Sequence, residues 1–180
     1  MKTTYIFLAS VAFLILSAAT VHAQGDPVFF GPTPYLSSDD IPEGFYAGGV
    51  PDVLADFEDG LPHPVMYGTT GGPMSPSPRT DSVDADDGEI DGLGFDGTSW
   101  NVGSGAHLYI YFSPPLPTAA GLVWTDGTGG VSFEAYDHNH DSMGIIGPFD
   151  LEDGFNTGGT AEDRFFGVQK VDGILRIDLM

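Results

Sequence analysis

The densest group of acidic side chains lies between Asp81 and Gly92, in the run Asp-Ser-Val-Asp-Ala-Asp-Asp-Gly-Glu-Ile-Asp-Gly. Calcium takes about six to eight oxygen ligands, and closely spaced carboxylates on a glycine-containing loop can supply them. The EF-hand spacing does not fit, because Gly88 stands where a third acidic ligand belongs. The run therefore predicts a calcium site of another kind, with a solvated acidic turn as the alternative. The ligands that we expect are Asp84, Asp86, Asp87, Glu89 and Asp91.

A second polar run, Asp137-His-Asn-His-Asp141, also begins like an EF-hand loop, but Ser142 replaces the glycine that such a loop requires. The run separates two segments with strand-like alternation, so we expect a polar hairpin turn here. The alternative is a transition-metal site formed by His138 and His140.

The sequence offers little that could do catalysis. Glu89-Ile-Asp91 is similar to the E-I-D-x-x-E strand of jelly-roll glycoside hydrolases, but Gly94 occupies the position of the second carboxylate that such enzymes need. The chain contains no cysteine, no G-x-S-x-G turn and no H-E-x-x-H helix. We therefore expect the protein not to be an enzyme.

Aromatic side chains form another candidate site, a platform on which sugar rings could stack. The candidates are Trp100, Tyr109, Tyr111, Trp124 and Tyr136. Trp124 ends the apolar run Leu-Val-Trp, so we expect it to be buried. Tyr109 and Tyr111 alternate with Leu108, Ile110 and Phe112, and should lie on the opposite face of their strand.

These candidate residues must be positioned by short strands. Alternation of apolar and polar side chains over five or six residues is typical of a half-buried strand. Asp-Gly, a strong turn signal, occurs seven times. The pattern predicts an all-β fold, an antiparallel β-sandwich of the jelly-roll type. We expect strands at 28–30, 53–57, 107–112, 122–124, 131–136, 143–146, 164–169 and 174–179, and a loop or sheet edge at 62–78.

The N-terminus predicts export and a division into three parts. Lys2 precedes an apolar run from Ile6 to Ala19, and Val21-His-Ala23 has the small-residue pattern of a cleavage site. The alternative, a membrane anchor, would need about 20 apolar residues. We expect a signal peptide at 1–23, an extended lead-in at 24–52 and a β-sandwich domain at 53–180, with no membrane span left after cleavage.

The charge of the chain limits its partners. Cleavage removes Lys2, one of five Lys and Arg residues in a chain with 26 Asp and Glu residues, and leaves a formal net charge of −22. Nucleic acids and anionic membranes need basic residues to neutralise phosphate, so both are excluded. Asp outnumbers Glu by 20 to 6, which favours turns and bound cations. The alternative is an acidic surface that serves only solubility in salt.

Five segments resemble a known group of domains. They are Asp56–Gly60, Asp81–Gly92, Gly121–Gly127, Val131–Asp137 and Thr160–Gly167. In this order they resemble secreted β-sandwich domains of bacterial proteins that often carry a PEP-CTERM sorting tag; the tag itself is absent from this chain. The resemblance covers residues 53 to 178. It implies a galactose-binding-like jelly roll in the extracellular matrix or on the cell surface, and it brings no catalytic residues.

The sequence and the resemblance together predict a non-catalytic extracellular β-sandwich, stabilised by calcium, with a structural or adhesive role. A carbohydrate-binding module is the alternative. The partners that we expect are an extracellular polysaccharide or a matrix protein.

Overall fold

The computed structural model describes residues 25–46, 65–68, 72–74, 82–95, 97–101, 107–127, 129–151 and 158–180. Within these ranges the regular structure is strand, with two short 3-10 turns and no α-helix. No helix in the same ranges is long and apolar enough to cross a membrane. The predicted signal peptide and the predicted strand at 53–57 lie outside the described residues.

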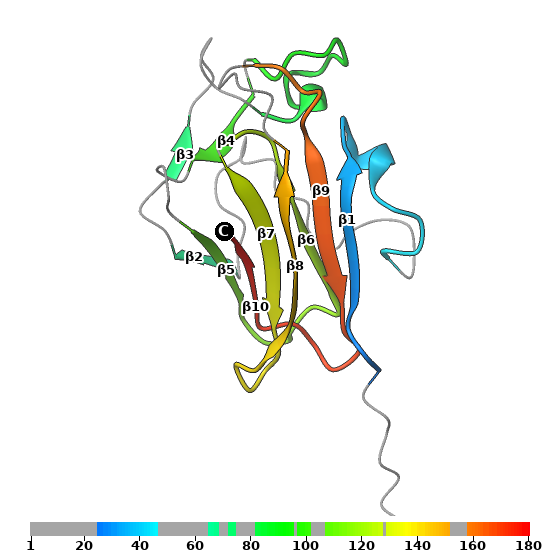
Figure 1. The fold of residues 1–180 in the computed structure, drawn as a ribbon, viewed down its shortest axis with the longest axis vertical. Helices are drawn as coiled ribbons and strands as arrows, with labels where there is room; N and C mark the ends of the chain where they lie inside the picture. The colour runs from blue at the N-terminus through cyan, green and yellow to red at the C-terminus, as the bar shows by residue number, and fades with distance from the viewer. Residues whose placement is uncertain are drawn as a thin grey trace, which may run out of the picture.

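The strands form two larger antiparallel sheets and one small one (Figure 1). The three-stranded sheet has the order β1 (Val28–Pro34), β9 (Arg164–Gln169), β6 (Ala119–Trp124). The five-stranded sheet has the order β2 (Val65–Gly68), β5 (Leu108–Phe112), β10 (Arg176–Leu179), β7 (Gly130–Tyr136), β8 (Ser142–Asp150). In the small sheet, β3 (Gly72–Met74) pairs with β4 (Ser99–Asn101). The prediction of an all-β fold with antiparallel pairing is confirmed.

Apolar side chains from the two larger sheets meet in one hydrophobic core. Phe133 and Ile177 enter it from the five-stranded sheet, and Phe166 and Val168 enter it from the three-stranded sheet. The rings of Phe133 and Phe166 stack with their centroids 5.9 Å apart. Full burial of such a side chain stabilises the fold by about 1.5–3 kcal/mol, so this core holds the two sheets together.

The alternation in the sequence gives the correct facing of the strands. Leu108 is buried, and Ile110 and Phe112 pack against the core. In β10 Ile177 is fully buried while the side chains on either side of it, Arg176 and Asp178, lie on the other face and interact with each other. Trp124 is buried, as expected from its apolar neighbours.

The segment expected to be a lead-in contributes a strand to the three-stranded sheet. β1 pairs antiparallel with β9 from Val28 opposite Gln169 to Pro34 opposite Arg164. The sequence predicted only residues 28–30, because Gly31, Pro32 and Pro34 are turn signals. Pro lacks an amide donor and is tolerated on an edge strand, which is the position of β1.

The structure describes two of the segments that were predicted to be turns or loops. The run from Asp137 to Asp141 is the polar hairpin turn between β7 and β8, as expected. Burial acts to raise the pKa of Asp137, but hydrogen bonds from the amides of Asn139 and Asp141 outweigh it and lower that pKa. In the stretch predicted to be a loop or sheet edge, β2 is an edge strand of the five-stranded sheet and β3 pairs with β4.

Candidate functional site

The outward face of the five-stranded sheet carries a compact group of aromatic and charged side chains, which we call the tyrosine face. Its members are Tyr109, Tyr111, Glu134, Tyr136, Arg176 and Asp178. Strand pairing brings them together in two rows across β5, β10 and β7. Arg176 lies between Tyr111 and Tyr136, and in the next row Asp178 lies between Tyr109 and Glu134. Directly opposed residues of an antiparallel pair point to the same side and contact each other.

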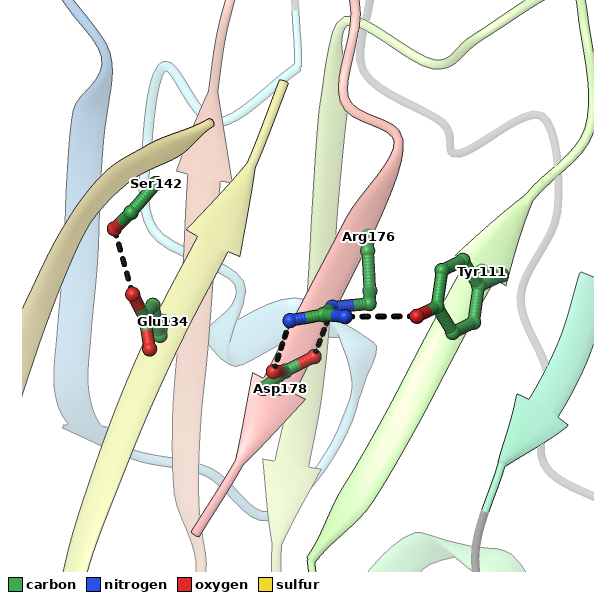
Figure 2. A network of polar contacts seen from close by, with 5 residues as sticks. All are labelled: Tyr111, Glu134, Ser142, Arg176 and Asp178. Atoms are coloured by element: carbon green, nitrogen blue, oxygen red, sulfur yellow. Dashed lines mark hydrogen bonds and ion pairs between the residues drawn. The ribbon is translucent and has the colours of Figure 1, made fainter. Parts of the chain in front are cut away.

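Arg176 is the centre of this group (Figure 2). Its Nε lies 2.8 Å from Oδ1 of Asp178, and its Nη2 donates to Oδ2 of the same carboxylate at 2.9 Å. Its Nη1 donates to the hydroxyl oxygen of Tyr111 at 2.7 Å. A two-point pair between guanidinium and carboxylate fixes geometry as well as charge, so the position of Arg176 is set from two directions.

The tyrosine rings surround the same guanidinium. Its central carbon lies 3.7 Å from the ring centroid of Tyr136, 5.3 Å from that of Tyr111 and 5.6 Å from that of Tyr109. A cation within about 6 Å of an aromatic face is attracted by about 0.5–2 kcal/mol, depending on its exposure to water. Burial acts to lower the pKa of Arg176, but the hydrogen bond with Tyr111 and the charge of Asp178 outweigh it and raise that pKa.

Asp178 is almost completely buried, with 2% of its surface exposed. Burial raises its pKa to about 6, although the ion pair with Arg176 acts to lower it. The negative charge of Glu134 adds to the rise, and His107 acts against it.

Glu134 lies on the β8 side of the tyrosine face. Its Oε1 accepts a hydrogen bond of 2.6 Å from the hydroxyl of Ser142, which is exposed at the start of β8 (Figure 2). Glu134 also helps to raise the pKa of Tyr136, after the larger effect of burial. Arg176, the cation of this face, is paired with Asp178 rather than with Glu134. Glu134 thus adds a negative charge to the face.

The acidic loop at 82–92 has a different arrangement. Asp84, which begins the 3-10 turn Asp84–Asp87, is 1% exposed. Its Oδ1 accepts from the amides of Asp91 at 3.0 Å and Gly92 at 3.1 Å, and its Oδ2 accepts from Gly92 and from the hydroxyl of Thr160. Asp84 thereby closes the loop on itself and ties it to a residue 76 positions further along the chain.

The other expected calcium ligands are placed less tightly. Glu89 and Asp91 are exposed, and Oδ1 of Asp91 accepts from the amide of Leu93. Asp86 is half-buried, and the side chain of Asp87 lies outside the described part of the chain. Among the side chains that the structure describes, no three His, Asp or Glu residues are grouped to hold a metal ion. The oxygens of Asp84 already serve amide and hydroxyl donors, so this geometry does not by itself favour calcium.

The remaining sequence candidates lie elsewhere. Glu89-Ile-Asp91 is in a loop with Ile90 exposed, not in a strand. Trp100 is on β4 in the small sheet. Of the five aromatic candidates, Tyr109, Tyr111 and Tyr136 are brought together.

Sequence reasoning did not assign a role to Glu134, Arg176 or Asp178. The available signal was the alternation in β7 and β10, which places each of them on the face opposite the core.

Comparison of the chain with protein-family models, with curated proteins and with solved structures finds no match in any of the three.

Proposed function

We propose that the protein is a non-catalytic, exported adhesive domain that binds an extracellular glycan on the tyrosine face. The observation that carries this proposal is the group of three tyrosine rings around the paired Arg176 and Asp178. We further infer that its two larger sheets form a β-sandwich of the galactose-binding-like jelly-roll type. Its place would be the extracellular matrix or the cell surface.

The chemistry of the face suits a sugar. Small-ligand sites combine aromatic surface with a few accurately placed polar groups. Tyrosine supplies both, because its ring offers apolar area and its hydroxyl offers a hydrogen bond. Arg176 is already held by Asp178 and Tyr111, so binding would cost little additional ordering of that side chain.

The strand spacing suits an extended ligand rather than a single small molecule. Neighbouring strands lie about 4.8 Å apart, which puts Tyr111 and Tyr136, the two residues opposite Arg176, about 10 Å apart across β10. A short oligosaccharide laid across the strands could contact both rings. A sheet supplies these positions with little mobility, which favours recognition of a repeating polymer.

The state of the carboxylates supports a binding role without catalysis. A retaining glycosidase needs two carboxyl groups about 5 Å apart that can act as acid and nucleophile. Asp178 is buried and paired at two points with Arg176, so it is not available to attack a substrate.

Calcium stabilisation is a separate proposal, and it rests on charge. The formal net charge is −21, and Glu89 and Asp91 lie exposed beside Asp84. A divalent ion would lower the repulsion between these groups, with a Kd of roughly 10⁻⁴ to 10⁻³ M, the range of extracellular modules.

The experiment is a glycan array with the mature chain, residues 24–180, in calcium and in chelator. We expect binding to a restricted set of glycans, weakened about tenfold or more by Tyr109→Ala. Tyr46→Ala is the matched control, since Tyr46 is a half-buried tyrosine that packs on Phe45 beside the other sheet. An array without binding, or equal losses in the two variants, would contradict the proposal; a matrix protein would then be the partner to test.

A further inference from the structure

We propose that the tyrosine face selects glycans with free amino groups, such as polymers of glucosamine, over glycans that carry carboxylate or sulfate groups. This inference rests on the proposed glycan binding and adds the charge of the ligand. Three observations carry it: the pairing of Arg176 with Asp178, the position of Glu134, and the charge of the whole chain.

Asp178 competes with an anionic sugar for Arg176. Recognition of a carboxylate or sulfate favours the open fork of a guanidinium group. Here Nη2 donates to Asp178, Nη1 donates to Tyr111, Nε lies 2.8 Å from the carboxylate of Asp178, and the central carbon of the group lies 3.7 Å from the ring centroid of Tyr136. An anionic ligand that displaced Asp178 would leave a buried carboxylate without its partner.

Glu134 makes the face attractive to a cation. Where Asp178 is ionised it offsets the charge of Arg176, and Glu134 then adds a negative charge to the tyrosine face. An ammonium group has three donors and no acceptor, and it fits carboxylate and hydroxyl oxygens and the faces of aromatic rings. Glu134 and Tyr136 supply the carboxylate and hydroxyl oxygens on one strand, with Ser142 orienting the carboxylate from β8.

The field of the chain acts in the same direction at longer range. A formal net charge of −21 attracts cationic polymers and repels anionic ones before contact. This long-range effect is screened by salt beyond about 10 Å, whereas a contact with Glu134 is screened less. Ionic strength therefore separates the two contributions.

The experiment is calorimetric titration of the mature chain with hexamers of glucosamine, N-acetylglucosamine and galacturonic acid, at a pH at which the amine is charged. We expect the glucosamine hexamer to bind about tenfold more tightly than the neutral N-acetylated hexamer, a difference of about 1.4 kcal/mol. The galacturonate hexamer should bind most weakly. Glu134→Gln should remove most of the preference for the amine and keep the affinity for the neutral hexamer.

Glu43→Gln is the matched control, because Glu43 is exposed in the segment after β1 and loses the same charge. Equal affinity for the glucosamine and N-acetylated hexamers would overturn the inference and leave the proposed glycan binding intact. An equal loss of preference in both variants would show that net charge acts without Glu134, and would overturn the site. If none of the hexamers binds and the array is also blank, the proposed function itself fails.

Discussion

The outward faces of the two larger sheets differ in which residues cover them. On the three-stranded sheet, the segment after β1 turns back beside that strand (Figure 1), and Tyr35 and Phe45 are buried against Phe165. The rings of Phe45 and Phe165 lie edge to face with centroids 4.9 Å apart. On the five-stranded sheet, the outward face keeps half-buried tyrosines and charged groups.

The outward face of the three-stranded sheet fits the segment that covers it. At Gly167 of β9 a Cβ atom would lie 2.5 Å from the ring of Phe45, so the absence of a side chain makes room for that ring. Gln169 then donates to the carbonyls of Gly44 and Phe45 at 2.7 Å each. One outward face therefore carries apolar residues and the other carries polar and aromatic residues. If the tyrosine face binds a glycan as proposed, stability and binding depend on opposite sides of the molecule.

The largest effect should follow from truncating Phe45, an aromatic side chain of the segment that covers the three-stranded sheet. Phe45→Ala should lower the free energy of unfolding by about 3–5 kcal/mol, since it leaves a cavity among Phe30, Tyr46 and Phe165. At roughly 2–4 °C per kcal/mol, the melting temperature should fall by about 10 °C. Glycan binding by the folded fraction should be unchanged. If Tyr109→Ala costs as much stability, or Phe45→Ala abolishes binding, the division between the two faces is wrong.

The next effect concerns pH and belongs to the tyrosine face. The pKa of Asp178 is about 6 in the folded protein and 3.8 as its ordinary value, so the folded state binds more protons between these values. The contribution of Asp178 to the free energy of unfolding should therefore rise as the pH falls from about 7 to about 4, by about 3 kcal/mol at most.

The other acidic residues also lose repulsion on acidification, so Asp178→Asn is needed as the reference. Chemical denaturation at a series of pH values should give a steeper gain for the native chain than for this variant. Parallel curves would show that Asp178 does not titrate in this window.

Asp84→Asn should destabilise the protein through the acidic loop, which lies on the covered side. The acidic loop belongs there, because the amide of Ala85 donates to the carbonyl of Leu36 and Val83 packs against the cluster around Tyr35. An amide oxygen cannot replace both acceptor oxygens of the buried carboxylate, so we expect a loss of about 1–3 kcal/mol. The loss should be the same in calcium and in chelator if Asp84 is structural.

The calcium proposal is tested by thermal melts in calcium, in magnesium and in chelator at constant ionic strength. Calcium should raise the melting temperature more than magnesium does, and Glu89→Gln with Asp91→Asn should reduce that difference. Equal effects of the two ions would leave only screening of the net charge.

The smallest effect should come from one hydroxyl. Tyr111→Phe removes the acceptor of the hydrogen bond from Nη1 of Arg176 and keeps the ring. We expect stability to fall by about 0.5–1.5 kcal/mol. Affinity for the glycan should fall only slightly if stacking on the ring dominates. A loss of binding as large as that of Tyr109→Ala would show that hydrogen bonding positions the ligand.

The sequence predicted more of the fold than of the site. Alternation identified β5, β7 and β10, because a period of two is a local property. It could not predict that β10 lies between β5 and β7, since this order depends on contacts between distant segments. The grouping of Arg176 with Tyr111 and Tyr136 follows from that order and was therefore not visible.

The acidic loop shows the same limit. Counting carboxylates predicted ligands, whereas the role of Asp84 depends on which backbone amides it meets after folding. Composition does not contain that information. β2 and β3 lie in the stretch predicted to be a loop or sheet edge, and their bounds could not be predicted because Pro and Gly dominate their surroundings.

The most direct test of glycan binding on the tyrosine face is a map of the bound surface by nuclear magnetic resonance. Backbone amide shifts of the mature chain would be followed during titration with the glucosamine and N-acetylglucosamine hexamers. The largest changes should fall in residues 107–112, 132–136 and 176–180, with none of comparable size in 28–46 or 164–169. Changes concentrated on the covered side, or absent with both hexamers, would contradict the account.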